Sequence, residues 1–204
     1  MVAGVARAIE FFFDYGSPYS YLADAVLPDL ARRHGAQLVY RPMLLGGVFK
    51  ATGNQSPAME PVVAKRAYGG LALQRTAALC GVAVPRNPHF PINTLALMRV
   101  AVAAQQAGVF APFHAALYPA FWAKGLDLGK AEVIAEVVTG AGLDAADLAQ
   151  RADSRPVKDE LRATTEEAIA RGAFGAPSLF FAGELYFGVD HLPFLERALA
   201  SSPA

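Results

Sequence analysis

The sequence contains a single cysteine, Cys80, among its 204 residues. One thiol excludes an intrachain disulfide and also a cysteine-rich zinc or iron–sulfur site. Histidine is scarce as well, and its four copies show no spacing typical of metal ligands. No apolar run approaches the ~18 residues of a membrane-spanning helix, and residues 1–8 lack the apolar core of a signal peptide. We therefore expect a soluble, cytoplasmic protein that holds no metal.

An excess of charge of either sign is also absent. Lysine and arginine together number 18, aspartate and glutamate also 18, and the isoelectric point is about 6.9. This balance provides no bulk attraction to nucleic acid or to an acidic membrane surface. What the chain has in abundance is apolar residues, at 54% with a mean hydropathy of +0.29, which excludes a disordered chain. The length suits one domain, or one domain with a sizeable insertion.

The N-terminal part predicts a strand, a helix and a second strand. Residues 9–14 are a short apolar run of the kind that forms a strand buried on both faces. Ser17 is a good helix N-cap, Pro18 suits the first helical position, and a helical pattern continues over 19–34. Residues 37–42 predict the next strand. Such a unit requires its two strands to be parallel.

The rest of the chain predicts a long helical block and then a hairpin. We expect 43–57 to be a loop, because it has three glycines and a proline. Two short strands are predicted around 182–183, and they need an existing sheet to join. An insertion of helices into one α/β domain therefore explains the order better than two successive domains. The predicted helices are 59–80, 92–107, 110–123, 129–140, 144–151, 156–171 and 191–200.

The chain resembles the DsbA-like branch of the thioredoxin superfamily in three features. These are the order of its elements, a short motif at the first helix, and a proline at the start of the third strand. That branch has C-x-x-C where this chain has S-P-Y-S at 17–20. Without those cysteines, disulfide exchange has no chemistry at this position. The resemblance implies an α/β, thioredoxin-like fold with an inserted all-helical domain. Its thioredoxin-like part would comprise 1–57 and 156–204, and its helical insertion 58–155.

Four sequence motifs indicate which group within this branch the chain resembles. They are F-D-Y-G-S-P-Y-S-Y-L at 13–22, R-P-M-L-L-G-G-V-F-K-A-T-G-N at 41–54, G-A-P-S at 175–178 and F-G-V-D at 187–190. In this order they resemble 2-hydroxychromene-2-carboxylate isomerases and kappa-class glutathione transferases, over nearly the whole chain. The last motif of that family usually reads G-x-D-R, whereas this chain has His191.

Ser17 is the candidate catalytic residue. By itself, a serine followed by a proline is most simply an ordinary N-cap. The resemblance implies that Ser17 also holds the thiolate of glutathione, which the helix N-terminus favours electrostatically. Lowering a thiol pKa by ~2 requires about 2.7 kcal/mol. A helix terminus contributes roughly 0.3–2 kcal/mol and a charge-assisted hydrogen bond about 1.5–3, which is sufficient.

The remaining site residues follow from the resemblance. A cis peptide bond before Pro177 would direct the backbone of Ala176 toward glutathione. The residues by themselves are equally compatible with a trans proline that begins an edge strand. By its position just before the last helix, Asp190 is predicted to be its N-cap. The resemblance implies in addition that its carboxylate meets the α-amine of glutathione. The full set for glutathione is Ser17, Ala176, Pro177, Gly188, Val189, Asp190 and His191. For the substrate the resemblance implies Lys50 and Asn54, which by spacing alone could equally be a solvated loop lysine and a turn asparagine. Arg86 is added to the substrate set because it lies in a polar loop at 86–90 that could line the pocket.

The implied function is a glutathione-dependent isomerase. It would interconvert 2-hydroxychromene-2-carboxylate and trans-o-hydroxybenzylidenepyruvate by reversible addition of the thiolate, as part of the degradation of aromatic compounds. Its partners would be glutathione, a small aromatic carboxylate and a second copy of the chain in a homodimer. Two alternatives remain open. One is a kappa-like glutathione transferase, and the other is a non-catalytic DsbA-like binding module.

Overall fold

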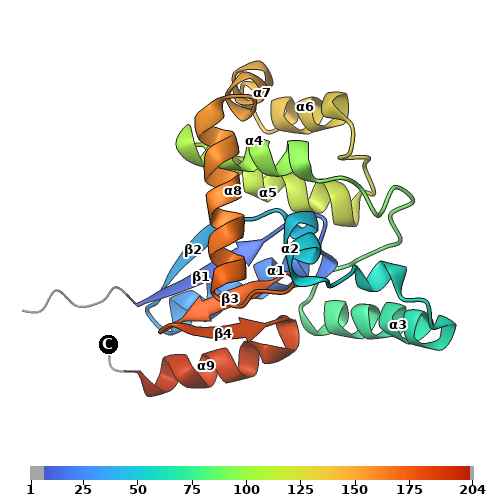
Figure 1. Cartoon of the computed structure of the whole chain (residues 1–204), viewed down its shortest axis with the longest axis vertical. Coiled ribbons are helices and arrows are strands. Elements are labelled where there is room, and N and C mark those ends of the chain that lie inside the picture. The colour runs from blue at the N-terminus through green and yellow to red at the C-terminus, as the bar shows by residue number, and fades with distance from the viewer. Residues whose placement is uncertain (1–6, 203–204) are drawn as a thin grey trace, which may run out of the picture.

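A computed structural model describes residues 7–202 of the chain (Figure 1). Its four-stranded sheet has the order β2-β1-β3-β4, in which β1 and β2 are parallel and the other neighbours antiparallel. The predicted strand-helix-strand unit and the predicted hairpin are both confirmed. Residues 1–6, on which the signal-peptide expectation largely rests, lie outside the described residues. The strands are β1 (Ala8–Phe13), β2 (Gln37–Pro42), β3 (Ser178–Phe181) and β4 (Glu184–Phe187).

Helices cover both faces of this sheet (Figure 1). Within residues 7–202, no helix is both long and apolar enough to cross a membrane. The same residues contain no group of three or more histidine, cysteine, aspartate or glutamate side chains placed to hold a metal ion. The helices are α1 (Pro18–Arg33), α2 (Leu45–Thr52), α3 (Val63–Leu79), α4 (Leu95–Gln106), α5 (Phe110–Tyr118), α6 (Ala131–Gly140), α7 (Ala145–Ala152), α8 (Arg155–Ala170) and α9 (Leu192–Ser201), with short turns η1 (Pro57–Met59), η2 (Pro119–Ala123) and η3 (Val189–His191).

β1 is the centre of the packing. Its side chains at Ile9, Phe11 and Phe13 belong to the main hydrophobic core, which α1, α4, α5 and α9 share. On the opposite face, Phe12 packs with Phe180 in a second core that α2 and α8 complete. Because successive side chains of a strand point to opposite faces, an unbroken apolar run is stable only when both faces are covered. The prediction of a strand buried on both faces is confirmed.

The predicted loop over 43–57 is wrong for its middle, because 45–52 form α2. Its start is anchored from a distance, since Leu44 N donates to Thr165 Oγ1 at 2.9 Å and Leu45 N donates to Asp14 Oδ2 at 2.8 Å. A Cβ on Gly47 would lie 3.3 Å from the Thr165 methyl carbon, so the glycine permits α2 to pack closely on α8. Tertiary contacts thus overcome the low helix propensity of the two glycines.

The predicted helix over 110–123 is also corrected. α5 ends at Tyr118, and 119–123 continue as a wider, π-helical turn. Pro119 explains the change, because it has no N–H with which to continue the α-helical hydrogen bonds. The other predicted helices agree with the structure to within a few residues. α3 extends away from the rest of the helices in Figure 1, and several of its apolar side chains are exposed.

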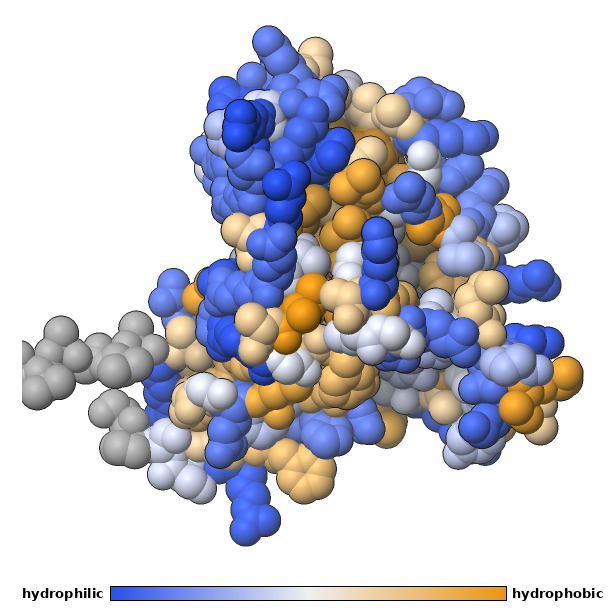
Figure 2. Space-filling model, viewed as in Figure 1, coloured by the Kyte–Doolittle hydropathy of each residue, from blue (hydrophilic) through white to orange (hydrophobic). Residues whose placement is uncertain are grey.

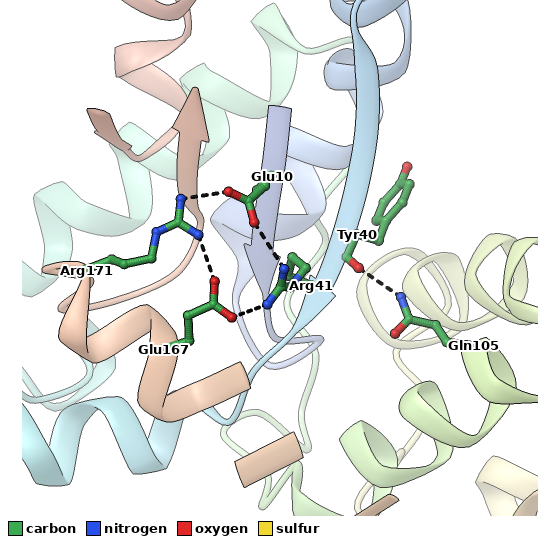
Figure 3. Close-up of polar contacts among 6 residues, drawn as sticks. All are labelled: Glu10, Tyr40, Arg41, Gln105, Glu167 and Arg171. Carbon is green, nitrogen blue, oxygen red and sulfur yellow. Dashed lines mark hydrogen bonds and ion pairs between the residues drawn. The ribbon is translucent and has the colours of Figure 1, made fainter. Parts of the chain in front are cut away.

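A ring of ion pairs ties β1 and β2 to α8 and the turn that follows it (Figure 3). Glu10 pairs with Arg171 at 2.7 Å and with Arg41 at 3.1 Å, while Glu167 pairs with Arg171 at 2.9 Å and also with Arg41. The Arg171 guanidinium carbon lies 3.9 Å from the centre of the Phe180 ring. Each charge thus meets two opposite charges, an arrangement that fixes the position of α8 over the sheet.

Candidate functional site

Ser17 caps α1 with its side chain, and only 3% of the residue is exposed. Its Oγ accepts a hydrogen bond from Ser20 N at 3.1 Å and donates one to Ala176 O at 2.8 Å. The predicted N-cap is therefore confirmed. A hydroxyl has a single proton, so an anion bound here would have to replace the Ala176 carbonyl as its acceptor.

The peptide bond between Ala176 and Pro177 is cis, as the resemblance implied. Pro177 O accepts a hydrogen bond from Gly188 N at 3.1 Å, which joins the segment before β3 to the segment after β4. Ser178 Oγ donates to Gly175 O at 2.9 Å and so closes the turn that precedes β3. Ser17, Ala176, Pro177 and Gly188 therefore lie together at the N-terminus of α1.

Asp190 lies at the same corner but is not the N-cap of the last helix. It belongs to η3, and α9 has His191 as its N-cap, without a side-chain hydrogen bond. The Asp190 carboxylate instead folds back over Gly188, where a Cβ would lie 2.5 Å from its Oδ1. Gly188 also has φ +86°, a backbone conformation that favours glycine. The predicted cap is wrong because the chain makes a 3-10 turn before the helix begins.

The negative charge of Asp190 acts on Tyr19, the second residue of α1. The pKa of Tyr19 is raised above its usual 10.0, first by burial and then by the negative charge of Asp190. Asp190 and His191 are exposed, whereas Val189 is buried and contributes to the main core. An exposed carboxylate beside the N-terminus of α1 is suited to a cationic group of a ligand.

The predicted substrate residues lie on exposed segments. Lys50 is in the last turn of α2 rather than on a loop. Asn54 follows α2, and its Nδ2 donates to Phe174 O at 2.8 Å, two residues before Ala176. Arg86 is exposed and has no hydrogen bond or ion pair to another residue in the range 7–202. Asn54 is thus joined to the Ala176 segment, whereas no hydrogen bond or ion pair links Lys50 or Arg86 to Ser17 within that range.

Sequence reasoning missed the role of Asp14, which is completely buried. Its carboxylate accepts hydrogen bonds from Gly16 N at 2.8 Å, Leu45 N at 2.8 Å and Thr94 Oγ1 at 2.9 Å. Burial raises the pKa of Asp14 above 3.8, and the three donors offset part of that rise. The carboxylate joins the loop before Ser17 to the starts of α2 and α4. An aspartate ending a buried apolar strand was the available signal.

A second, partly buried network lies behind the same loop, and its four members come from different elements. Tyr15 Oη and His114 Nδ1 are 2.7 Å apart, and His114 Nε2 lies 2.9 Å from Asp24 Oδ1. Tyr40 Oη donates to the same Asp24 oxygen at 3.0 Å. One arrangement of protons satisfies both contacts: the Tyr15 hydroxyl donates to His114 Nδ1, and Nε2 donates to the Asp24 carboxylate. The network joins α5 to α1, β2 and the Ser17 loop.

We expect Tyr15→Phe to lower the free energy of unfolding by about 1–2 kcal/mol, because His114 Nδ1 loses its buried donor. Urea denaturation of the two proteins measures the difference. Tyr21→Phe is the matched control, because no hydrogen bond of the Tyr21 hydroxyl is present among the described residues. Equal losses in the two variants would contradict a structural role for the network.

Comparison with known proteins places this geometry in a family. The family model described as a DSBA-like thioredoxin domain matches residues 8–200. A 2-hydroxychromene-2-carboxylate isomerase of Sphingobium xenophagum is 34% identical over 198 residues, covering 96% of this chain and 99% of the relative. Glutathione S-transferase kappa 1 of Rattus norvegicus is 30% identical over 205 residues, covering 95% and 91%.

Solved structures agree with these relatives. A 2-hydroxychromene-2-carboxylate isomerase superposes with a TM-score of 0.80 at 28% identity, covering 95% of this chain and 94% of the other. A probable DsbA oxidoreductase of Streptomyces coelicolor gives 0.73 at 22% identity, covering 97% and 92%, which shows the fold alone. The chain therefore belongs to the family of DsbA-like thioredoxin-domain proteins that includes the 2-hydroxychromene-2-carboxylate isomerases and the kappa-class glutathione transferases.

Proposed function

We propose that this protein is a glutathione-dependent isomerase of the 2-hydroxychromene-2-carboxylate type. The observation that carries the proposal is the buried Ser17 hydroxyl at the N-terminus of α1, 2.8 Å from Ala176 O. It occupies the position where DsbA-like oxidoreductases have the first cysteine of C-x-x-C. The chain thus has a polar donor but no thiol of its own at this position, so a thiolate nucleophile would have to come from a bound molecule.

Ser17 and Ala176 would exchange partners when glutathione binds. The Ser17 hydroxyl would turn from Ala176 O to the glutathione sulfur and donate its proton in a hydrogen bond there. The released Ala176 carbonyl would then accept the N–H of the glutathione cysteine, as in an added β-strand. No hydrogen bond is lost in this exchange, and the α1 N-terminus further favours the thiolate.

The reaction would proceed by addition and elimination at this sulfur. The thiolate would add to the conjugated double bond of an aromatic pyruvate derivative, and the electron pair of that bond would move toward the carbonyl as an enolate. Rotation about the resulting single bond and expulsion of the thiolate would restore the double bond in the other configuration. Glutathione is regenerated, so nothing is oxidised and nothing is consumed.

The charged residues around Ser17 would position the two ligands. The exposed Asp190 carboxylate suits the glutathione α-amine, with Pro177, Gly188, Val189 and His191 completing that end of the site. Lys50 and Arg86 would attract the carboxylate of the substrate, and Asn54 would orient its carbonyl or stabilise the enolate. In this proposal the helical insertion comprises 58–155, and the thioredoxin-like part comprises 1–57 and 156–204.

The compartment, the metabolic role and the oligomeric state are also part of the proposal, and they follow from the same family resemblance. We expect a cytoplasmic homodimer that acts in the degradation of aromatic compounds. The apolar side chains exposed on and beside α3 are where a second copy would most readily dock, because their burial would remove apolar surface from water. They are Met59, Val62, Val63, Tyr68, Leu71 and Leu79.

A kappa-like glutathione transferase is the second candidate, favoured by the 30% identity to the rat kappa enzyme. It would form the same thiolate but release a conjugate. A non-catalytic binding module is the third candidate, and it would require neither thiolate formation nor the surrounding charged residues.

Glutathione titration followed by calorimetry and by ultraviolet thiolate absorbance at neutral pH tests the proposal. We expect binding with thiolate formation, and then turnover of the chromene carboxylate while total glutathione stays constant. Consumption of glutathione during turnover would establish the transferase instead. Binding without thiolate formation would favour the binding module, and an absence of binding would overturn both glutathione-dependent enzymes, the isomerase and the transferase.

A further inference from the structure

α2, α4 and α8 line a hollow of about 390 Å³, open on one side, that the proposed reaction does not use. No residue assigned above to glutathione or to the isomerase substrate lines it. Its volume falls within the ~300–1,000 Å³ of small-molecule sites. In Figure 2, apolar surface gathers in the hollowed part of the visible face above α2, and hydrophilic side chains border it along α8. The apolar floor consists mainly of Leu44, Leu95, Leu161 and Ile169.

Arg99 is the central polar group of this hollow. It projects from α4, is half-buried, and has no carboxylate within 4.0 Å among residues 7–202. It also lines an adjacent hollow of about 180 Å³ between α4, α6 and α7. A half-buried guanidinium without an anionic partner is electrostatically suited to an anion from outside the chain.

Two further cations border the hollow from α8. Lys158 Nζ lies 3.2 Å from Asp153 Oδ1, while the closest carboxylate to Arg162 is that of Asp159 at 3.9 Å. Glu166 is the one carboxylate among the residues that line the hollow, against the three cations. The rim therefore has a net positive charge, and Arg162 has no close hydrogen-bonded ion pair to lose when an anion binds.

We propose that this hollow is a second ligand site, which binds a small aromatic carboxylate. The ring would cover the leucine and isoleucine floor, and the carboxylate would pair with Arg99 and Arg162. The apolar floor disfavours inorganic anions, because they have no apolar surface to bury against it. The cationic rim disfavours neutral or basic aromatic molecules, because they have no negative charge to pair with the arginines. Binding here requires neither glutathione nor Ser17, so the proposal stands independently of the proposed reaction.

The four isoleucines of the chain make the test specific to this place. Ile169 lies in the floor of the hollow, Ile134 lines the adjacent hollow, Ile9 is in the core, and Ile92 is on the segment before α4. Methyl NMR of isoleucine-labelled protein, titrated with 2-naphthoate in the absence of glutathione, reports on each separately. We expect a saturable shift of the Ile169 methyl signal and little change at Ile9. The amide 2-naphthamide, which lacks the charge, should bind more weakly.

Charge variants complete the test. Arg99→Ala and Arg162→Ala should each weaken binding by about fivefold or more, the effect of losing one partly exposed ion pair. Arg162 is well exposed, so its variant should fold even if Arg99→Ala does not. Arg155→Ala is the matched control, because it removes the same charge from α8 at an exposed position outside the hollow. An unmoved Ile169 signal, shifts confined to Ile92, equal binding of the amide, or equal loss in Arg155→Ala would each overturn the proposal.

Discussion

Replacing Ser17 by alanine should raise the pKa of bound glutathione by about 1–2, since a hydrogen bond to a charged group contributes about 1.5–3 kcal/mol. Most of the bound thiol would then be protonated at neutral pH, and we expect turnover to fall by roughly 10- to 100-fold. The protein should still fold, with a loss of about 0.5–2 kcal/mol from the missing helix cap. Thiolate absorbance at increasing pH measures the first effect, and isomerase assays measure the second.

Ser20→Ala is the matched control for this experiment. Ser20 is fully buried in the first turn of the same helix, and its hydroxyl has no hydrogen-bond partner of good geometry within the described residues. Its backbone N–H, which donates to Ser17 Oγ, is unchanged by the substitution. We expect nearly normal thiolate formation and turnover. A Ser17→Ala protein that matched Ser20→Ala in both assays would contradict the role assigned to the Ser17 hydroxyl.

Replacing Asp14 by alanine should be the most destabilising change near the site. Three buried or partly buried donors, on Gly16, Leu45 and Thr94, would lose their common acceptor. An unsatisfied donor costs about 1–3 kcal/mol, and with partial relaxation we expect a total loss of about 3–5 kcal/mol. Urea denaturation measures this loss. A loss below that of Tyr15→Phe would contradict the view that Asp14 holds the Ser17 loop, α2 and α4 together.

The titration of Asp14 predicts a pH dependence of known sign. Its pKa in the folded protein is raised above 3.8, mainly by burial, so folding favours the protonated form. The stability contributed by protonation is complete below 3.8 and is lost as the pH rises through the raised pKa. Asp14→Asn does not titrate and serves as the reference. From pH 4 to pH 7, wild-type stability should therefore fall relative to that of Asp14→Asn. A relative stability that rose with pH would show that the three donors outweigh burial.

Local patterns allowed much of the fold to be predicted. The apolar run before Asp14 indicated a strand buried on both faces, and Ser17 followed by Pro18 indicated the start of α1. Turn residues around Gly183 indicated the hairpin. These features depend on residues within one or two turns of each other, whose preferences are physical properties of the local chain.

The same local logic failed where distant contacts decide the conformation. The glycines of α2 suggested a loop, but Asp14 and Thr165 hold its first amides from other parts of the chain. Asp190 resembled an N-cap, yet its carboxylate covers Gly188 because a 3-10 turn comes first. In both cases the local preference is worth about 1 kcal/mol per residue, which a few buried contacts exceed.

By itself, the sequence determined the order of the strands and of the helices other than α2, and the candidate role of Ser17. It also excluded an intrachain disulfide, because Cys80 is the single cysteine. Only the tertiary structure decided that Asp14 joins three segments and that His114 links Tyr15 to Asp24. It also decided that Arg99 stands over an apolar hollow. Those groups are separated by tens of residues, and their chemistry arises from burial and proximity, which no local pattern encodes.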